Sequence, residues 1–264
     1  MKSSRLITLC VASLLPLLAF ADVGSEPTAK ETTAQEIVAR LVENNQRRHD
    51  ALKEYTSQRN YHLVYTGFPG RREADMVVDM KFESPDHKEF EVTSESGSGL
   101  ILNRVFRRLL ESEKEAADER NQKKTALTPD NYDFQLLGQE SVNGRSSYVL
   151  KVNPKADNKF LYQGTVWVDA ADFAVAKIEA QPAKNPSFWI KKTQIRHTYQ
   201  KFDDFWLPVE NQSTTDVKLG GHATLIIRYS GYKVVPRPDL QPASVALPAA
   251  LPKRSSLDVM MVRP

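Results

Sequence analysis

The side chains that could carry acid–base or metal chemistry are spread singly along this chain. The five histidines are His49, His62, His87, His197 and His222. None pairs with another at the spacing that places two ligands on one face of a strand or a helix. This spacing favours surface or edge histidines, although the fold could bring distant ones together.

Two pairs of aspartates have the spacing of paired carboxylates, Asp203 with Asp204 and Asp169 with Asp172. Such pairs can share general acid and base work. Each pair lies beside the end of an expected strand, however, where aspartate favours turns. The chain also lacks a phosphate-binding glycine loop, a nucleophile elbow and a His-Glu-x-x-His zinc motif. We therefore predict that the protein is not an enzyme and holds no metal or other cofactor.

The first 21 residues have the order of a cleavable signal peptide. Lys2 and Arg5 precede an apolar run over residues 6–18, and the small-x-small triplet of residues 19–21 follows. The run is shorter than the about 20 residues that a membrane-spanning helix needs. Cys10 lies inside the run and not at its end, which argues against a lipid anchor. We predict a bacterial protein that is exported to the periplasm, or otherwise exported, and is soluble after cleavage.

Composition limits the remaining function classes. Cys10 is the only cysteine, so a chain without the leader has no disulfide, thiol nucleophile or thiolate metal site. The chain has 36 basic and 33 acidic side chains, and the leader removes Lys2 and Arg5 from the basic set. The remaining charges nearly balance, which gives no support to nucleic-acid binding.

The period of the apolar residues predicts one α+β domain over residues 33–235. Thr33 and Glu36 form a capping box before a helix that reaches residue 51, and a second helix is expected over residues 102–110, continuing into the charged segment 111–124. Period-two alternation predicts strands over residues 55–65, 74–82, 90–92, 132–140, 146–152, 160–169, 173–181, 188–199, 209–218 and 223–235. We expect a curved antiparallel sheet, an unclosed half-barrel, that wraps two or three helices on its concave face.

The two flanking segments lack this periodicity. Residues 22–32 are small, polar or charged, which predicts a flexible lead. Residues 236–264 are rich in proline and have no apolar pattern, which predicts a disordered tail.

Apolar side chains suited to a ligand cavity alternate along the first three expected strands. Methionine and aromatic side chains can line a cavity that accepts flexible acyl chains. An ordinary closed core is the alternative. The candidate ligand-binding residues are Leu63, Tyr65, Met76, Val78, Met80, Phe82, Phe90 and Val92.

Three segments of the second half carry a family resemblance. Residues 184–208 read KNPSFWIKKTQIRHTYQKFDDFWLP, residues 161–182 read LYQGTVWVDAADFAVAKIEAQP, and residues 224–232 close the last strand. Together with the order of helix, three strands, helix and long meander, they resemble the outer-membrane lipoprotein-sorting superfamily, which includes LolA, LolB and RseB. The resemblance implies an unclosed β-barrel with helices on its concave side, whose cavity takes up lipid acyl chains.

The resemblance implies a function as well as a fold. The leading hypothesis is a periplasmic carrier that binds a lipid or lipoprotein, shields its acyl chains, and works with a membrane-associated donor or acceptor protein. An RseB-like sensor that binds lipoproteins and a membrane partner is the alternative, and it would favour a second small domain that the sequence does not indicate. An unrecognised enzyme is the third hypothesis. The carriers' gating arginine would correspond to Arg59, for which an ordinary surface arginine is the alternative.

Overall fold

The computed structural model describes residues 32–184, 190–218 and 220–239. Helix α1 (Ala34–Ala51) precedes three strands, β1 (Leu52–Thr66), β2 (Arg72–Glu83) and β3 (His87–Gly97). A helical segment then runs through α2 (Gly99–Ile101), a π-helical turn (Leu102–Phe106), α3 (Arg107–Ala117) and α4 (Glu119–Thr125). The remaining strands are β4 (Tyr132–Val142), β5 (Arg145–Pro154), β6 (Tyr162–Asp169), β7 (Val175–Pro182), β8 (Ile190–Phe202), β9 (Phe205–Val217) and β10 (Gly221–Pro236). The predicted signal peptide, the lead up to residue 31 and the tail from residue 240 lie outside the described residues.

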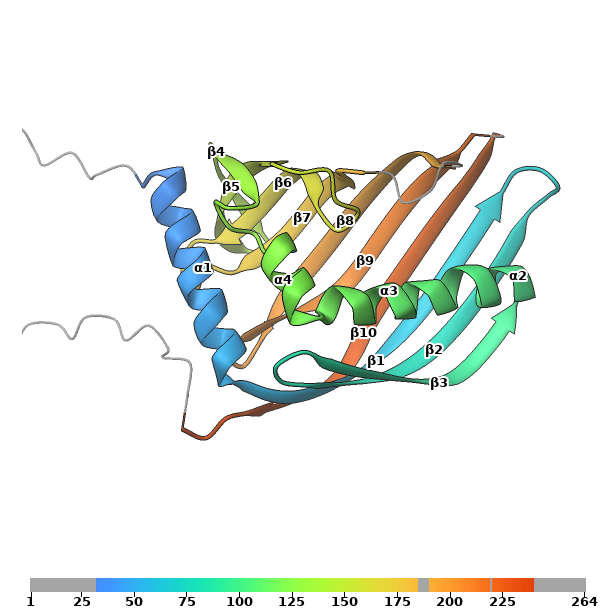
Figure 1. The fold of residues 1–264 in the computed structure, drawn as a ribbon, viewed down its shortest axis with the longest axis horizontal. Helices are drawn as coiled ribbons and strands as arrows, with labels where there is room; N and C mark the ends of the chain where they lie inside the picture. Colours follow the sequence, from blue (N-terminus) through green and yellow to red (C-terminus); the bar gives the residue numbers. More distant parts are fainter. Residues whose placement is uncertain (1–31, 185–189, 219, 240–264) are drawn as a thin grey trace, which may run out of the picture. The chain divides into compact units, whose positions relative to one another are not determined.

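The strands of the described residues form one sheet of ten strands in the order β3-β2-β1-β10-β9-β8-β7-β6-β5-β4. Every pair of neighbours is antiparallel, and the edge strands β3 and β4 do not pair with each other. The sheet is therefore unclosed, and it curves around the helices (Figure 1). This architecture confirms the predicted fold class.

Helix α1 covers the half of the concave face that β4 to β7 form. The capping box is present, because Thr33 Oγ1 accepts from the amide of Glu36 while Glu36 Oε2 accepts from the amide of Thr33. These bonds satisfy two amides that would otherwise lack partners at the start of the helix. The apolar stripe of α1, Ile37, Val38 and Leu41, packs on buried side chains of the sheet.

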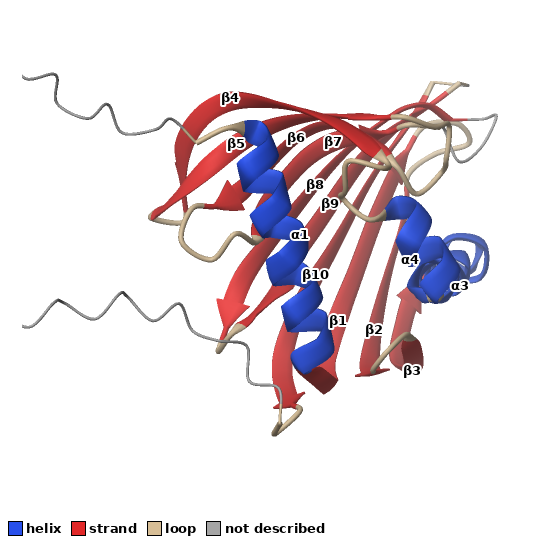
Figure 2. Cartoon of the chain, turned by 60° about the vertical axis from the view of Figure 1, so that its left-hand side comes forward, coloured by secondary structure: helices blue, strands red, loops and turns tan. Residues whose placement is uncertain are grey.

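The segment from α2 to α3 covers the other half, formed by β1, β2, β3 and β10. Ile101, Phe106 and Leu110 pack there on Tyr61 and Met76, among others. Figure 2 shows α1 and α3 as two separate covers on the same side of the sheet, with the central strands visible between them. The inner faces of β8 and β9 thus lie under the gap between two helices.

Several strand boundaries differ from those expected, and the contacts around two of them are informative. Strand β7 begins at Val175, because Phe173 adopts a left-handed backbone (φ 46°) in the preceding turn and stacks its ring against Tyr148. Strand β10 extends to Pro236, and the amide of Arg237 donates to the Ala51 carbonyl at 2.7 Å. The side chain of Arg237 also donates to Ser84 Oγ at 2.9 Å. Arg237, two residues beyond the predicted boundary at residue 235, is therefore hydrogen-bonded to the body of the domain.

Truncation at two positions tests this boundary. A chain that ends at Val235 loses both hydrogen bonds of Arg237, each worth about 1 kcal/mol, and should melt a few degrees lower than the full chain. A chain that ends at Asp239 keeps both bonds and should melt within about 1 °C of the full chain. Thermal unfolding measures both. Equal melting temperatures for the two truncated chains would show that Arg237 contributes nothing.

Candidate functional site

A cavity of about 820 Å³ lies between the concave face of the sheet and the helical segment from α2 to α3. The sheet side of the cavity is formed by β1, β2 and the central strands β8, β9 and β10. The other side is formed by α2, the π-helical turn and α3. Most of the lining is aliphatic or aromatic. These apolar residues are Leu63, Tyr65, Phe68, Leu100, Ile101, Val105, Leu109, Ile190, Ile195, Val217, Ala223, Leu225 and Ile227.

One wall of the cavity is polar. The inward side chains of β8 and β9 include Thr193, Asn211, Ser213 and Thr215, and the hydroxyls of Thr193 and Thr215 lie 3.1 Å apart. A wall with hydroxyl and amide groups beside a large apolar surface suits a ligand that has a long apolar part and a few hydrogen-bonding groups.

His197 also belongs to this wall, although its spacing predicted a surface or edge histidine. It is half-buried on β8 and lies beside Tyr199. Burial lowers the pKa of His197 to about 4, against the opposing effect of the Glu113 charge. The imidazole is therefore neutral at neutral pH, and the cavity wall carries no charge from it.

Arg59 of β1 and Glu113 of α3 form a largely buried ion pair. Arg59 is only 2% exposed, so it is not a surface arginine. Its Nη1 donates to Glu113 Oε2 of α3 at 2.6 Å, and Lys88 of β3 donates to Glu113 Oε1 at 3.0 Å. The guanidinium also lies over the rings of Phe90 and Tyr229, at 5.2 and 5.1 Å from their centroids. This pair fastens α3 to β1 and β3.

Electrostatics keep both members of the pair charged. Burial alone would raise the pKa of Glu113, but the charges and hydrogen bonds of Lys88 and Arg59 hold that pKa below its usual value. Burial likewise opposes the charge of Arg59, and Glu113 nevertheless raises the pKa of the guanidinium. Removing Glu113 would leave the Arg59 guanidinium buried without compensation, whereas Glu113 would keep Lys88 as a partner if Arg59 were removed.

The candidate ligand residues predicted from the sequence lie in three different environments. Leu63 and Tyr65 line the large cavity. Met76 and Val78 are fully buried under α3, where Phe90 and Val92 also pack. Met80 and Phe82 belong to a separate packed cluster with Tyr55, Phe205 and Leu207. Met80 and Phe90 also border a second space of about 820 Å³ whose lining includes Asp79, Lys81, Glu89, Glu91, Lys114 and Lys233.

Most of the residues that line the cavity were not among the ligand-binding residues predicted from the sequence. The alternation of Ala223, Leu225 and Ile227 on β10 and the helical spacing of Leu102, Val105 and Leu109 are visible patterns, but both equally fit closed core. Only the gap between the two helices distinguishes the cavity wall from the core.

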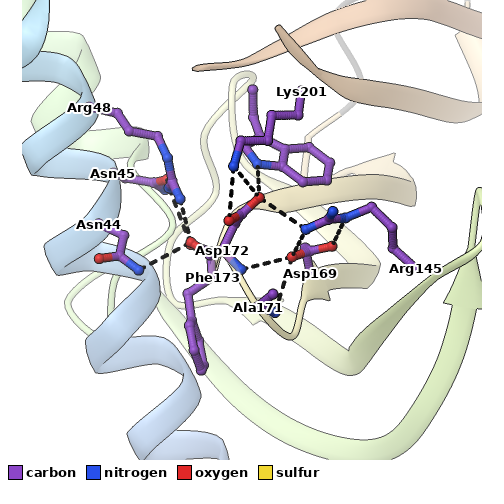
Figure 3. Close-up of polar contacts among 10 residues, drawn as sticks. Asn44, Asn45, Arg48, Arg145, Asp169, Ala171, Asp172, Phe173 and Lys201 are labelled. Carbon is purple, nitrogen blue, oxygen red and sulfur yellow. Dashed lines mark hydrogen bonds and ion pairs between the residues drawn. The ribbon is translucent and has the colours of Figure 1, made fainter. Parts of the chain in front are cut away.

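The aspartates of the β6–β7 turn have structural partners. Asp169 receives two bonds from Arg145, at 2.6 and 2.9 Å, and accepts from the amides of the turn (Figure 3). The Asp172 carboxylate contacts Arg145, Lys201 and Trp206, at 3.0 to 3.2 Å. The Asp172 carbonyl accepts from two side chains of α1, Asn44 and Arg48. This cluster therefore fastens α1 to the sheet.

One histidine gathers carboxylates on the outer face of the sheet. His62 Nδ1 lies 2.7 Å from Asp75 and its Nε2 lies 3.9 Å from Glu73, which also pairs with Arg71. All are partly or fully exposed. Since Arg71 already neutralises Glu73, these cross-strand pairs account for the cluster without a bound ion.

Among the described residues, no helix is both long and apolar enough to cross a membrane. No curated protein matches the chain. A family model described only as "Uncharacterized protein" matches residues 117–238, which is less than half of the chain.

Solved structures similar to this chain include members of the superfamily that its sequence resembles. A domain from Vibrio parahaemolyticus, provisionally described as an outer membrane lipoprotein-sorting protein, has 12% identity and a TM-score of 0.38, with 76% of this chain and 93% of that chain covered. A LolA superfamily protein from Nitrosomonas europaea has 17% identity and a TM-score of 0.32, with 79% and 96% covered. MucB of Pseudomonas aeruginosa, solved in complex with MucA, has 11% identity and a TM-score of 0.26, with 76% and 94% covered. These values are too low to carry an argument about activity.

The depressed pKa of His197 predicts a specific pH dependence of stability. Between its ordinary pKa of about 6.5 and the folded value of about 4, the unfolded chain binds a proton that the folded chain does not. The free energy of unfolding should therefore fall as pH drops through this window, by at most about 1.4 kcal/mol per pH unit from this group. Urea unfolding at pH 7, 6 and 5 measures the slope.

Two variants separate His197 from the other groups. His197→Gln should flatten the slope above pH 5, while His87→Gln, which changes an exposed histidine on β3, should keep it. An unchanged slope in His197→Gln would contradict the buried neutral imidazole.

Proposed function

We propose that this protein is a periplasmic carrier that holds acyl chains of a lipid or lipoprotein in the cavity beneath α2 and α3. The observation that carries the proposal is the cavity itself, with its volume of about 820 Å³ and its predominantly apolar lining. This volume falls in the range of about 300–1,000 Å³ that ligand sites occupy. The second large space supports it less, because charged side chains border it.

The hydrophobic effect supplies the driving force for such binding. Each methylene that moves from water into the cavity contributes about 0.8 kcal/mol, so ten methylenes contribute about 8 kcal/mol before the cost of ordering the ligand. The polar wall of β8 and β9 offers hydroxyl and amide groups to the carbonyl or ester end of the cargo. Because His197 is neutral, it offers no positive charge to this end of the cargo, and an uncharged carbonyl or ester fits the wall.

The cavity wall also differs from the core in how tightly it is packed. Met76 and Val78 are at most 1% exposed, while Leu225, Val105 and Leu109 are only half-buried. A wall that is incompletely covered by protein atoms leaves apolar surface that a ligand can cover. In the proposal, α3 is the movable cover of this wall, and the Arg59–Glu113 pair is its fastening, which makes Arg59 the gating residue.

A charge placed on the wall tests acyl binding. Leu225→Asp should weaken uptake of a fluorescent fatty acid at least tenfold, because a bound acyl chain would remove water from the introduced carboxylate. The same change should lower the free energy of unfolding by about 1–2 kcal/mol. Fluorescence titration and urea unfolding measure the two effects. Leu137→Asp is the matched control, since Leu137 is 53% exposed on β4. This variant should change neither the uptake of the fatty acid nor the free energy of unfolding.

An aspartate placed in the packed core gives the stability cost with which the Leu225→Asp variant can be compared. Met80→Asp changes a residue that is 2% exposed, and it should destabilise the fold by several kcal/mol more than Leu225→Asp does. The proposal is wrong if the wild-type protein takes up no acyl probe, or if Leu225→Asp binds it as tightly as the wild type.

The fastening of α3 predicts a kinetic effect. Glu113→Gln leaves Arg59 buried without a charged partner, so stability should fall by about 3 kcal/mol and the acyl probe should leave faster. Glu115→Gln, two positions along the same helix, changes an exposed glutamate paired with Lys159 and should leave both quantities near the wild-type values. Stopped-flow displacement of the bound probe gives the release rates. Equal release from Glu113→Gln and wild type would remove the gating role of this pair.

A further inference from the structure

The cavity reaches one end of the strands, where exposed apolar side chains form part of its lining. Since the sheet is antiparallel, the end of β1, the start of β2, the start of β8, the end of β9 and the start of β10 share this end, toward the upper right of Figure 1. Phe68 in the β1–β2 turn is 84% exposed, and Leu100 at the start of α2 is 51% exposed. Both line the cavity.

This exposure is concentrated at the cavity. In the part of the chain that the structure describes, four large hydrophobic side chains are exposed, and two of them are Phe68 and Leu100. The Gly67 backbone, just before Phe68, lies close against Gly221 at the start of β10. The two turns therefore meet, and the starts of α2 and β8 line the same cavity through Leu100, Ile101 and Ile190. We define the rim as residues 67–72, 99–101, 190–192, 218 and 220–222.

The rim is basic as well as apolar. It carries Arg71, Arg72, Lys191, Lys192 and Lys218, and Arg72 lines the cavity beside Phe68. The nearby acidic side chains are fewer: Glu73 pairs with Arg71 at 2.5 Å, and Asp216 pairs with His222 at 2.9 Å. The two tight turns at the opposite end of the strands, residues 84–86 and 203–204, carry Asp86, Asp203 and Asp204 and no basic side chain. Positive charge is thus gathered where the cavity meets solvent.

We propose that this rim docks the protein on the anionic surface of a lipid bilayer. An apolar side chain that inserts at the headgroup level and a set of basic side chains beside it are the two signals that together give stable but reversible membrane attachment. Phe68 and Leu100 would enter the interface, while Arg72, Lys191 and Lys192 would face the headgroup phosphates. The purpose of docking rests on the proposed function. If the cavity holds acyl chains, a docked protein could pass a chain between the bilayer and the cavity without exposing it to water.

Vesicle co-sedimentation tests the docking directly. The wild-type protein should bind vesicles of phosphatidylcholine with phosphatidylglycerol, bind pure phosphatidylcholine vesicles at least about tenfold more weakly, and lose binding as salt rises. Phe68→Ser with Leu100→Ser should weaken binding to the anionic vesicles. Lys191→Gln with Lys192→Gln should weaken it by about tenfold or more, since each basic residue near the surface contributes roughly fivefold.

Matched changes elsewhere serve as controls. Leu137→Ser removes an exposed leucine of β4, and Lys53→Gln with Lys151→Gln removes two exposed lysines away from the rim. Both controls should bind as the wild type does. Absence of wild-type binding to anionic vesicles, or equal losses in rim and control variants, would overturn the docking proposal.

Uptake of dispersed fatty acid, measured on the same protein, keeps the two proposals apart. A protein that takes up the dispersed probe but ignores vesicles would overturn docking alone. A protein that binds anionic vesicles through the rim but takes up no probe would support docking and overturn the carrier function.

Discussion

An open sheet must have its concave face covered, and the rest of this structure follows from that constraint. A ten-stranded antiparallel sheet whose edges do not meet has an apolar inner face, and helices are the elements available to bury it. Two separate helical segments do so here, each with its own core cluster. Because they cover the two halves and not the middle, part of the inner face of the central strands borders a cavity. A third, smaller core cluster includes Phe205 and Leu207 at the start of β9.

Each cover is fastened to the sheet by buried or half-buried charge. The turn of β6–β7 holds α1 through Asp172, and Arg59 holds α3 through Glu113. The two fastenings differ in kind. Backbone carbonyls of the β6–β7 turn accept hydrogen bonds from α1, whereas charged side-chain pairs hold α3. Glu113 is the partly buried member of these pairs and is shared between Arg59 and Lys88, while Arg107 with Glu95 and Glu115 with Lys159 are more exposed. In our account this difference makes α3 the cover that moves.

The sequence predicts the strands and their inward faces well, because period-two alternation is local. On β2, Ala74, Met76, Val78 and Met80 are buried as their spacing predicts, and the capping box at Thr33 marks the start of α1. The site is harder to predict. Met76 and Leu225 follow the same alternation, yet one is core and the other is cavity wall, because only the non-local placement of α3 separates them. The burial of Arg59, which pairs with Glu113 of α3, depends on that placement too.

The central claim is that acyl chains occupy the space between the central strands and α3. Paramagnetic broadening of methyl resonances by a fatty acid that carries a nitroxide near its methyl end tests this claim directly. The account predicts strong broadening for Leu63, Ile195 and Leu225, which line the cavity, and little for Ile37 and Val166, which pack under α1. Equal broadening of the two groups, or broadening confined to the second, would contradict it.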